Sequence, residues 1–276
     1  MIKLLIDSSA DLNKNNCDFA TLIPIGVTIG ENTYLDGIDL EKDEFYKIIT
    51  TTKARPLTSQ PSQQDFIEEF SKIKENGDEA IYFALSSQMS GTYKSATMAK
   101  EAVGYDKIHI IDSKLATSPL MLLVKHANKM LKQGCSAQQI VKECEQLKSR
   151  IKIIAGLDTL ENLRRGGRLS NASAIVGSLL NIKPIVTINE KGAVESIGKG
   201  LGVTKTINLI IQKFQQYQLD ENFPVYSAYT YGTGNAEKFE AKLAEIGIAT
   251  QDRLQIGPTV GTHLGPQVYG VVFVTK

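Results

Sequence analysis

The chain has 276 residues, of which 42% are hydrophobic and 22% are charged, a composition typical of a globular protein and not of a disordered or fibrous one. Lysine and arginine number 31 and aspartate and glutamate 30, and this balance, a net charge of +1, argues against a nucleic-acid-binding protein. The three cysteines are widely spaced, which argues against a disulfide framework and favours a cytoplasmic protein. The apolar runs are too short for a signal peptide or a membrane span.

The first 150 residues alternate compact apolar runs with longer amphipathic patterns. We expect strands at 2–6, 22–29, 80–85 and 107–111, because these runs are rich in Ile and Val. We expect helices at 39–50, from 62 past 73, and at 90–103, 115–132 and 136–149. Ser136 and Gln139 form a capping box for the last of them. Strand–helix alternation of this kind predicts a mostly parallel sheet with flanking helices.

The pattern changes near Arg150. Strands are expected at 151–155, 182–188, 193–197, 225–230, 253–256 and 267–274, and helices at 159–165, 171–180, 204–217 and 235–246. Asn189-Glu190-Lys191-Gly192 separates two of the strands and predicts a hairpin. Hairpins mixed with crossovers predict a mixed sheet with helices. The sequence therefore predicts an α/β fold of two domains, residues 1–150 and 151–276.

Hydroxyl groups gather at two expected helix starts. Thr58-Ser59-Gln60-Pro61-Ser62 lies where a loop leads into a helix, and Ser90-Gly91-Thr92 follows the strand 80–85. Free N–H groups and the positive end of the helix dipole are found at such places. Both segments can therefore either cap their helices or bind a carboxylate or phosphate group.

Two later segments hold basic side chains beside glycines. Arg164 and Arg165 suit a helix C-terminus, whereas Arg168 follows two glycines that let the chain turn it inward toward an acid. Residues 257–266 contain three glycines and two prolines, which predicts a shaped loop between two strands. Thr262 and His263 lie in this loop, where they either clamp a ligand or support the loop itself.

Signals for cofactors and metals are weak. The run from Tyr231 to Gly234 lacks the third glycine of a dinucleotide fingerprint, because Glu237 stands in its place. The sequence has neither a Walker-A motif nor a G-x-S-x-G elbow, and its three histidines are scattered without metal-ligand spacing. We therefore expect no cofactor and no metal.

The motifs together form an ordered set that extends along the whole chain. They are Asp7-Ser8-Ser9 with Asp11-Leu12, Thr58-Ser59-Gln60-Pro61-Ser62, Ser86-Ser87 with Ser90-Gly91-Thr92-Tyr93, Ile111-Asp112-Ser113, Leu160-Glu161-Asn162-Leu163 with Gly166-Gly167-Arg168, Asn181-Ile182-Lys183-Pro184, and Ile256-Gly257-Pro258 with Gly261-Thr262-His263 and Gly265-Pro266. In this order they resemble the DegV family of bacterial fatty-acid-binding proteins.

The resemblance implies a two-domain α/β fold that buries one long-chain fatty acid between its domains. It implies a carrier without catalytic residues, which presents the carboxylate to a separate fatty-acid kinase and serves lipid transport and phospholipid metabolism. Thr58 and Ser90 are then the hydroxyl donors to the carboxylate, and Arg168 and His263 complete the polar network. The expected binding residues also include their neighbours Ser59, Gly91, Thr92 and Thr262.

The sequence departs from the family pattern in two places. Leu201 stands where the family usually has an arginine, which affects a basic contact with a kinase or with the acid. Residues 117–122 contain Pro119 and Met121 where the family favours glycines, which affects chain-length preference if this segment lines the tail pocket. Two other functions compete with the carrier. One is an enzyme acting on a small carboxylate or phosphoester with His263 as base, and the other is a regulatory sensor of acyl chains.

Overall fold

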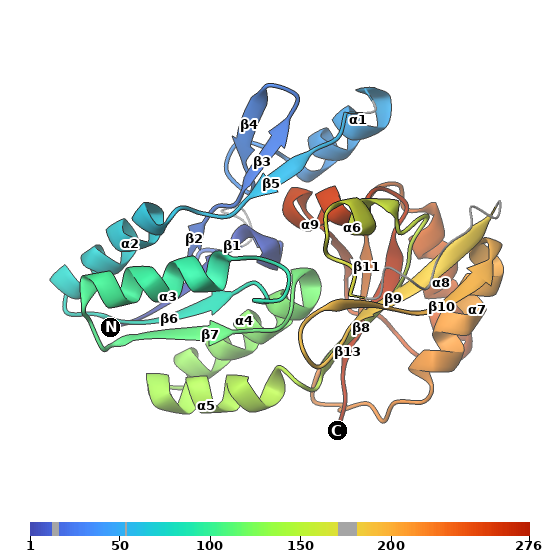
Figure 1. The fold of residues 1–276 in the computed structure, drawn as a ribbon. Coiled ribbons are helices and arrows are strands. Elements are labelled where there is room, and N and C mark those ends of the chain that lie inside the picture. The colour runs from blue at the N-terminus through green and yellow to red at the C-terminus, as the bar shows by residue number, and fades with distance from the viewer. Residues whose placement is uncertain (13–16, 53, 171–180) are drawn as a thin grey trace.

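The protein combines a parallel sheet, a mixed sheet and a small antiparallel sheet (Figure 1). The structure is a computed structural model that describes residues 1–12, 17–52, 54–170 and 181–276. The parallel sheet has the strand order β2-β1-β6-β7. Its strands are β1 (Ile2–Asp7), β2 (Ala20–Ile23), β6 (Glu79–Ala84) and β7 (Ile108–Asp112).

Helices cover both faces of the parallel sheet, with α2 and α3 on one face and α4 and α5 on the other (Figure 1). The side chains of β6 alternate accordingly, since Tyr82 packs with α2 and α3 whereas Ile81 and Phe83 pack with α4 and α5. The helices are α2 (Gln63–Glu75), α3 (Thr92–Val103), α4 (Thr117–Lys132) and α5 (Ala137–Leu147), and a short 3₁₀ helix η1 (Ser8–Ala10) follows β1.

The mixed sheet has the order β10-β9-β8-β13-β11-β12, in which only β11 and β12 pair in parallel. Helices α7 and α8 pack on one face, and α4 contacts β8 and β13 from the other. The elements of this half are β8 (Ile151–Gly156), α6 (Glu161–Arg165), β9 (Ile182–Ile188), β10 (Val194–Leu201), α7 (Gly202–Phe214), β11 (Tyr226–Tyr229), α8 (Gly234–Glu245), β12 (Arg253–Gln255), α9 (Pro258–Leu264) and β13 (Tyr269–Val274).

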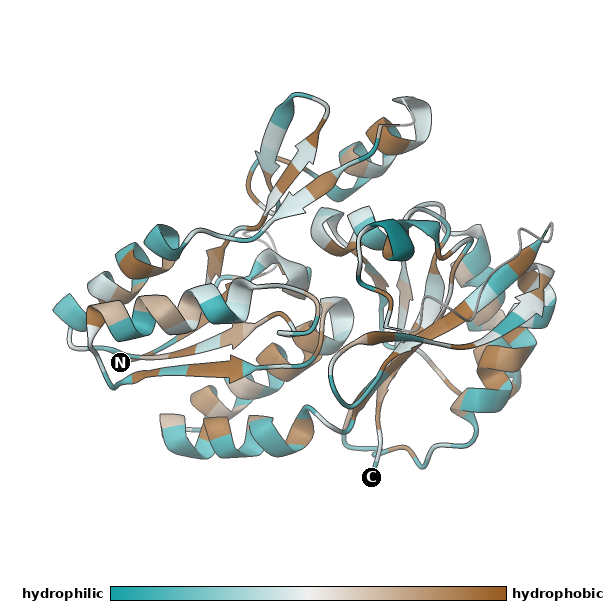
Figure 2. Cartoon of the chain, in the orientation of Figure 1, coloured by the Kyte–Doolittle hydropathy of each residue, from teal (hydrophilic) through white to brown (hydrophobic). Residues whose placement is uncertain are grey.

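One apolar cluster joins the two larger sheets. It contains Leu4 and Phe83 of the parallel sheet, Leu123 of α4, and Ile153 and Val272 of the mixed sheet. Hydrophobic residues are accordingly concentrated on the strands and on the inner sides of the helices (Figure 2). The α/β fold class is as predicted, and the division into domains 1–150 and 151–276 stays a prediction.

The small antiparallel sheet is a feature that the sequence did not predict. Its order is β4-β3-β5, and α1 packs with it through Phe45 and Tyr46. The expected single strand at 22–29 is instead two strands in different sheets, because Pro24 lacks an N–H and stands between them. The elements are β3 (Gly26–Ile29), β4 (Asn32–Leu35), α1 (Lys42–Thr52) and β5 (Leu57–Ser59).

Two further predictions near the site were wrong. Thr58 lies in β5 and does not begin a helix; Ser62 caps α2 through a capping box with Asp65. The segment 257–266 is not a loop, because residues Pro258–Leu264 form helix α9. The capping box of Ser136 and the hairpin of β9 and β10 are confirmed. The expected helix at 171–180 lies outside the described residues.

Candidate functional site

The turn that follows β6 is held in place by the buried carboxylate of Asp7. Asp7 ends β1 and accepts hydrogen bonds from the Tyr82 hydroxyl (2.9 Å) and from the Leu85 backbone N–H (2.8 Å). Ser87 donates to the carboxylate of Asp112 at the end of β7 (2.6 Å). Carboxyl ends of parallel strands meet at one edge of a sheet, and here they hold the segment that carries Ser90.

Of the predicted residues 90–92, Ser90 alone lines a cavity. Its hydroxyl oxygen lies 2.8 Å from that of Thr92, which is buried. Gly91 leaves room for a neighbour, because a Cβ there would lie 2.1 Å from the side-chain oxygen of Gln60. Thr92 and Gly91 therefore shape the helix start, whereas Ser90 faces the cavity.

Helix α9 carries His263, which lines the same cavity as Ser90. Pro258 stands at the first position of α9, where no N–H is needed, and Gly257 precedes it. Two buried carboxylates accept hydrogen bonds from the start of this helix: Asp11 from the Gly257 N–H (2.7 Å) and Asp36 from the Thr259 N–H (3.0 Å). Burial raises the pKa of Asp11, and it raises the pKa of Asp36 to about 7.

The imidazole of His263 lies between β5 and the end of α6. Its Nε2 is 3.1 Å from the hydroxyl oxygen of Thr58. On the other side, a Cβ at Gly166 would lie 2.5 Å from its Nδ1. Burial lowers the pKa of His263 to about 4, with a further contribution from the positive charge of Arg168. His263 is therefore neutral at pH 7.

Arg168 is anchored by backbone carbonyls from both halves of the chain. Its Nε donates to the carbonyl of Met89 (3.0 Å) and its Nη1 to that of Gly166. These bonds use Nε and Nη1, and Nη2 donates to no group among the described residues. Arg168 lines the cavity, and its role toward an acid stays a prediction.

An inner cavity of about 360 Å³ lies among these groups. Its polar lining contains five of the predicted residues, Thr58, Ser59, Ser90, Arg168 and His263, together with Gln60 and Thr259. Its apolar lining comes from both halves of the chain and consists of Ile25, Leu85, Met89, Leu163, Val194, Val260 and Leu264. No Asp or Glu lines this cavity among the described residues. The volume falls within the range of small-molecule sites.

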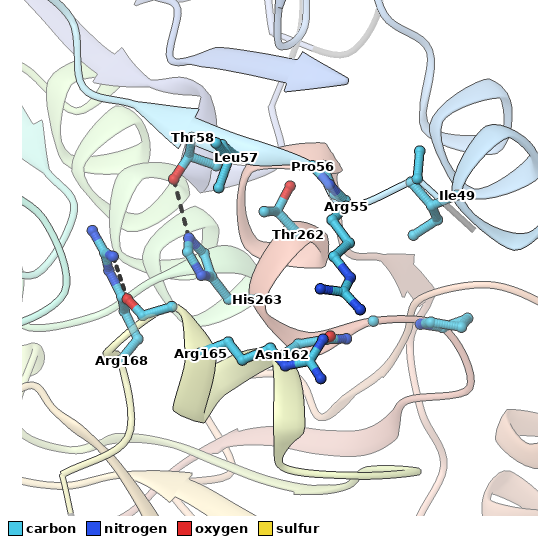
Figure 3. Close-up of a pocket in the computed structure, with 14 residues that line it drawn as sticks. Ile49, Arg55, Pro56, Leu57, Thr58, Asn162, Arg165, Arg168, Thr262 and His263 are labelled. Carbon is cyan, nitrogen blue, oxygen red and sulfur yellow. Dashed lines mark hydrogen bonds between the residues drawn. The ribbon is translucent and has the colours of Figure 1, made fainter. Parts of the chain in front are cut away.

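An outer cavity of about 510 Å³ adjoins the inner one (Figure 3). The two share Thr58, Arg168 and His263, so these side chains form the partition between them. Thr262, a predicted binding residue, lines only the outer cavity, and its hydroxyl donates to the Pro258 carbonyl within α9 (2.9 Å).

The apolar wall of the inner cavity and the roles of the buried carboxylates are not predicted by the sequence. The wall residues lie after strands, in β10 or on helices, and no local signal separates them from core residues. Asp11 belongs to a motif that was singled out, but its role in holding α9 depends on a contact 246 positions away. Residues 117–122 do not line the inner cavity; Met121 borders a separate cavity of about 300 Å³.

Other site classes find less support in the described ranges. No group of three or more His, Cys, Asp or Glu side chains there is arranged to hold a metal ion. No helix in those ranges is long and apolar enough to cross a membrane. The fold and the inner cavity together define an α/β protein with a site suited to an amphipathic anion, because the lining contains both apolar side chains and hydrogen-bond donors.

Comparison with known proteins identifies the family. The family model described as "Uncharacterised protein, DegV family" matches residues 1–276. A DegV domain-containing protein from Caldanaerobacter subterraneus subsp. tengcongensis is 36% identical over 274 residues, which cover 99% of this chain and 96% of that protein. The chain belongs to the DegV family.

Solved structures agree in fold over the full length. A DegV family protein from Thermus thermophilus, described by its fatty-acid binding, has a TM-score of 0.88 at 26% identity, with 100% of this chain and 99% of that chain covered. A stearic-acid-binding protein from Eubacterium ventriosum has a TM-score of 0.88 at 28% identity, with the same coverage. These similarities confirm the predicted α/β architecture.

Proposed function

We propose that this protein binds one long-chain fatty acid in the inner cavity, between its two halves, and presents the carboxylate to a separate fatty-acid kinase in the cytoplasm. The observation that carries the proposal is the lining of the inner cavity, which combines apolar side chains with hydroxyl, imidazole and guanidinium groups and holds no Asp or Glu among the described residues. The fatty-acid binding described for the relatives from Thermus thermophilus and Eubacterium ventriosum supports it.

The apolar wall favours a long acyl chain. Burial of each CH₂ contributes about 0.8 kcal/mol, so a tail of roughly 16 carbons offers about 12 kcal/mol before the entropic cost of association. The wall side chains, Met89 and Leu264 among them, approach from both halves of the chain. A tail held there is shielded from water on both sides.

The polar end supplies donors for one carboxylate. Arg168 provides positive charge, and Ser90 and Thr58 provide hydroxyl groups. A bound carboxylate selects the His263 tautomer with hydrogen on Nε2, because His263 then donates to Thr58 and the Thr58 hydroxyl is free to donate to the acid. Charge-assisted bonds of about 1.5–3 kcal/mol each offset the desolvation of the carboxylate.

The alternative function, an enzyme with His263 as general base, is less well supported. The 3.1 Å contact between Thr58 and His263 has the geometry of a nucleophile and its base. However, a pKa of about 4 makes His263 a weak base at neutral pH. The positive charge of Arg168 acts on His263, and no carboxylate is hydrogen-bonded to its ring among the described residues, as a catalytic triad would require.

The test compares two ligands that differ only in the head group. After delipidation, hexadecanoate should raise the melting temperature of the protein, because a ligand that binds only the native state stabilises it. Hexadecanol, with the same tail and no charge, should give a much smaller shift. Equal shifts would refute the carboxylate site, and no shift with either ligand would refute the fatty-acid proposal.

The kinase step has its own assay. When the loaded protein is mixed with ATP and a fatty-acid kinase, a carboxylate oxygen should displace ADP from the γ-phosphate to form an acyl phosphate, which hydroxylamine traps as a hydroxamate. Lys199 and Lys205 are exposed beside Leu201, which is 56% exposed, and this surface remains basic without the usual arginine. Absence of hydroxamate with an active kinase would refute the presentation step and leave fatty-acid binding intact.

A further inference from the structure

The outer cavity has a charge pattern that the proposed function does not use. Its described lining contains Arg55, Arg165 and Arg168 and no Asp or Glu. The whole chain carries a net charge of only +1, so this concentration of positive charge is local. Arg168 is occupied with backbone carbonyls and faces the inner cavity as well. Arg55 and Arg165 line the outer cavity alone.

Arg55 forms no ion pair with any residue that the structure describes. The positions outside the described ranges hold no Asp or Glu that could pair with it. Arg165 shares the carboxylate of Glu161 with Arg164, so this trio keeps one net positive charge. In Figure 3 the guanidinium groups of Arg55 and Arg165 point into the cavity from opposite sides. Arg55 comes from the segment before β5 and Arg165 from the end of α6.

Two guanidinium groups that converge without a shared carboxylate match an anion with several oxygens. A guanidinium donates two parallel hydrogen bonds to a carboxylate or phosphate group. A phosphate group carries more charge and more acceptor oxygens than a carboxylate, so it can be held by two arginines at once. The side-chain amide of Asn162 lies in the same lining and adds a neutral donor.

We infer that the outer cavity is a phosphate-binding subsite in which Arg55 and Arg165 bind the phosphate group. This subsite adjoins the carboxylate site, and Thr58 and His263 lie between the two. The inference rests on the proposed function only for the identity of the neighbouring carboxylate. The subsite itself is defined by the two arginines. Because both are exposed, affinity for phosphate alone is expected in the millimolar range.

The matched control for this site is Arg164. It neighbours Arg165, is exposed and pairs with the same Glu161, but it lines neither cavity. Arg55→Gln, Arg165→Gln and Arg164→Gln each remove one positive charge. Inorganic phosphate would be titrated into the delipidated protein and followed by ³¹P line broadening at constant ionic strength.

Arg55→Gln and Arg165→Gln should each weaken phosphate binding by about tenfold, whereas Arg164→Gln should change it less than about twofold. Equal losses in all three variants would show general surface attraction and overturn the inference, as would absence of broadening with the wild-type protein. Hexadecanoate affinity, measured in parallel, should be unchanged in Arg55→Gln and Arg165→Gln. Failure of hexadecanoate to bind the wild-type protein would refute the carrier without affecting the phosphate result.

Discussion

The contact between Gly166 and His263 gives the sharpest test of the carboxylate site. A Cβ at position 166 would lie 2.5 Å from Nδ1 and 3.0 Å from Cε1 of His263, whereas ordinary contact begins at 3.4 Å. In Gly166→Ala the ring must therefore move by about 0.9 Å. It cannot move closer to Thr58, which is already 3.1 Å from Nε2, so the hydrogen bond between them should break.

The expected loss falls on ligand affinity more than on stability. If the pair orients one charge-assisted bond to the carboxylate, its loss costs about 1.5–3 kcal/mol, or roughly ten- to hundredfold in hexadecanoate affinity. The φ of Gly166 is −72°, which alanine adopts without strain. The gain from reduced unfolded-state entropy, about 0.4–1 kcal/mol, should then offset part of the overpacking cost.

Calorimetric titration of the delipidated variants measures this effect. Gly234→Ala is the control, because nothing lies within 4 Å of the new Cβ and affinity should be unchanged. In a His263→Ala background, Gly166→Ala should have no further effect on affinity, since the clashing ring is gone. Full affinity in Gly166→Ala, or additive losses in the double variant, would refute the role of this contact.

Three other predictions concern neighbouring groups. Ser90→Ala should lower hexadecanoate affinity roughly ten- to hundredfold by calorimetry; if its bond to Thr92 is its only role, the empty protein should instead lose about 1 kcal/mol of stability at unchanged affinity. The pKa of His263 is lowered to about 4, so as the pH falls its imidazole is protonated in the unfolded chain before it is protonated in the folded chain. Wild type should therefore lose more stability than His263→Gln between pH 6.5 and pH 4, as measured by denaturation. The pKa of Asp36 is raised to about 7, so the folded chain binds this proton first; wild type should gain stability from pH 8 to 5 relative to Asp36→Asn, and parallel curves would contradict this.

Local signals in the sequence predicted the larger part of the fold. The apolar runs of β1, β6 and β7 and the capping box of Ser136 depend on neighbours in sequence, and these elements form where expected. The small sheet was missed because β4 and β5 are short and largely exposed, so that their apolar pattern is weak. Their pairing with β3 is specified by contacts across the sheet instead of by periodicity.

Helix α9 was missed because its glycines and prolines were interpreted as loop signals. Each one has a role compatible with a helix: Pro258 needs no N–H at the first position, and Gly265, at φ 75°, ends the helix. Gly261 lies inside it because a Cβ there would be 2.3 Å from the hydroxyl oxygen of Tyr46. That hydroxyl in turn donates to the Ile256 carbonyl (2.9 Å), a contact that spacing along the chain does not reveal.

The buried carboxylates explain how an anion site forms in a chain whose acidic residues nearly equal its basic residues in number. Asp7, Asp11 and Asp36 line neither the inner nor the outer cavity. Each accepts a backbone N–H at the start of a segment that carries a site residue: Asp7 in the turn before Ser90, and Asp11 and Asp36 at the start of the helix that carries His263. Burial raises the pKa of all three, and backbone N–H groups satisfy their oxygens within the frame, whereas the polar side chains that line the two cavities are neutral groups and arginines. The aspartates of the N-terminal motif therefore act on the ligand through the backbone that they position.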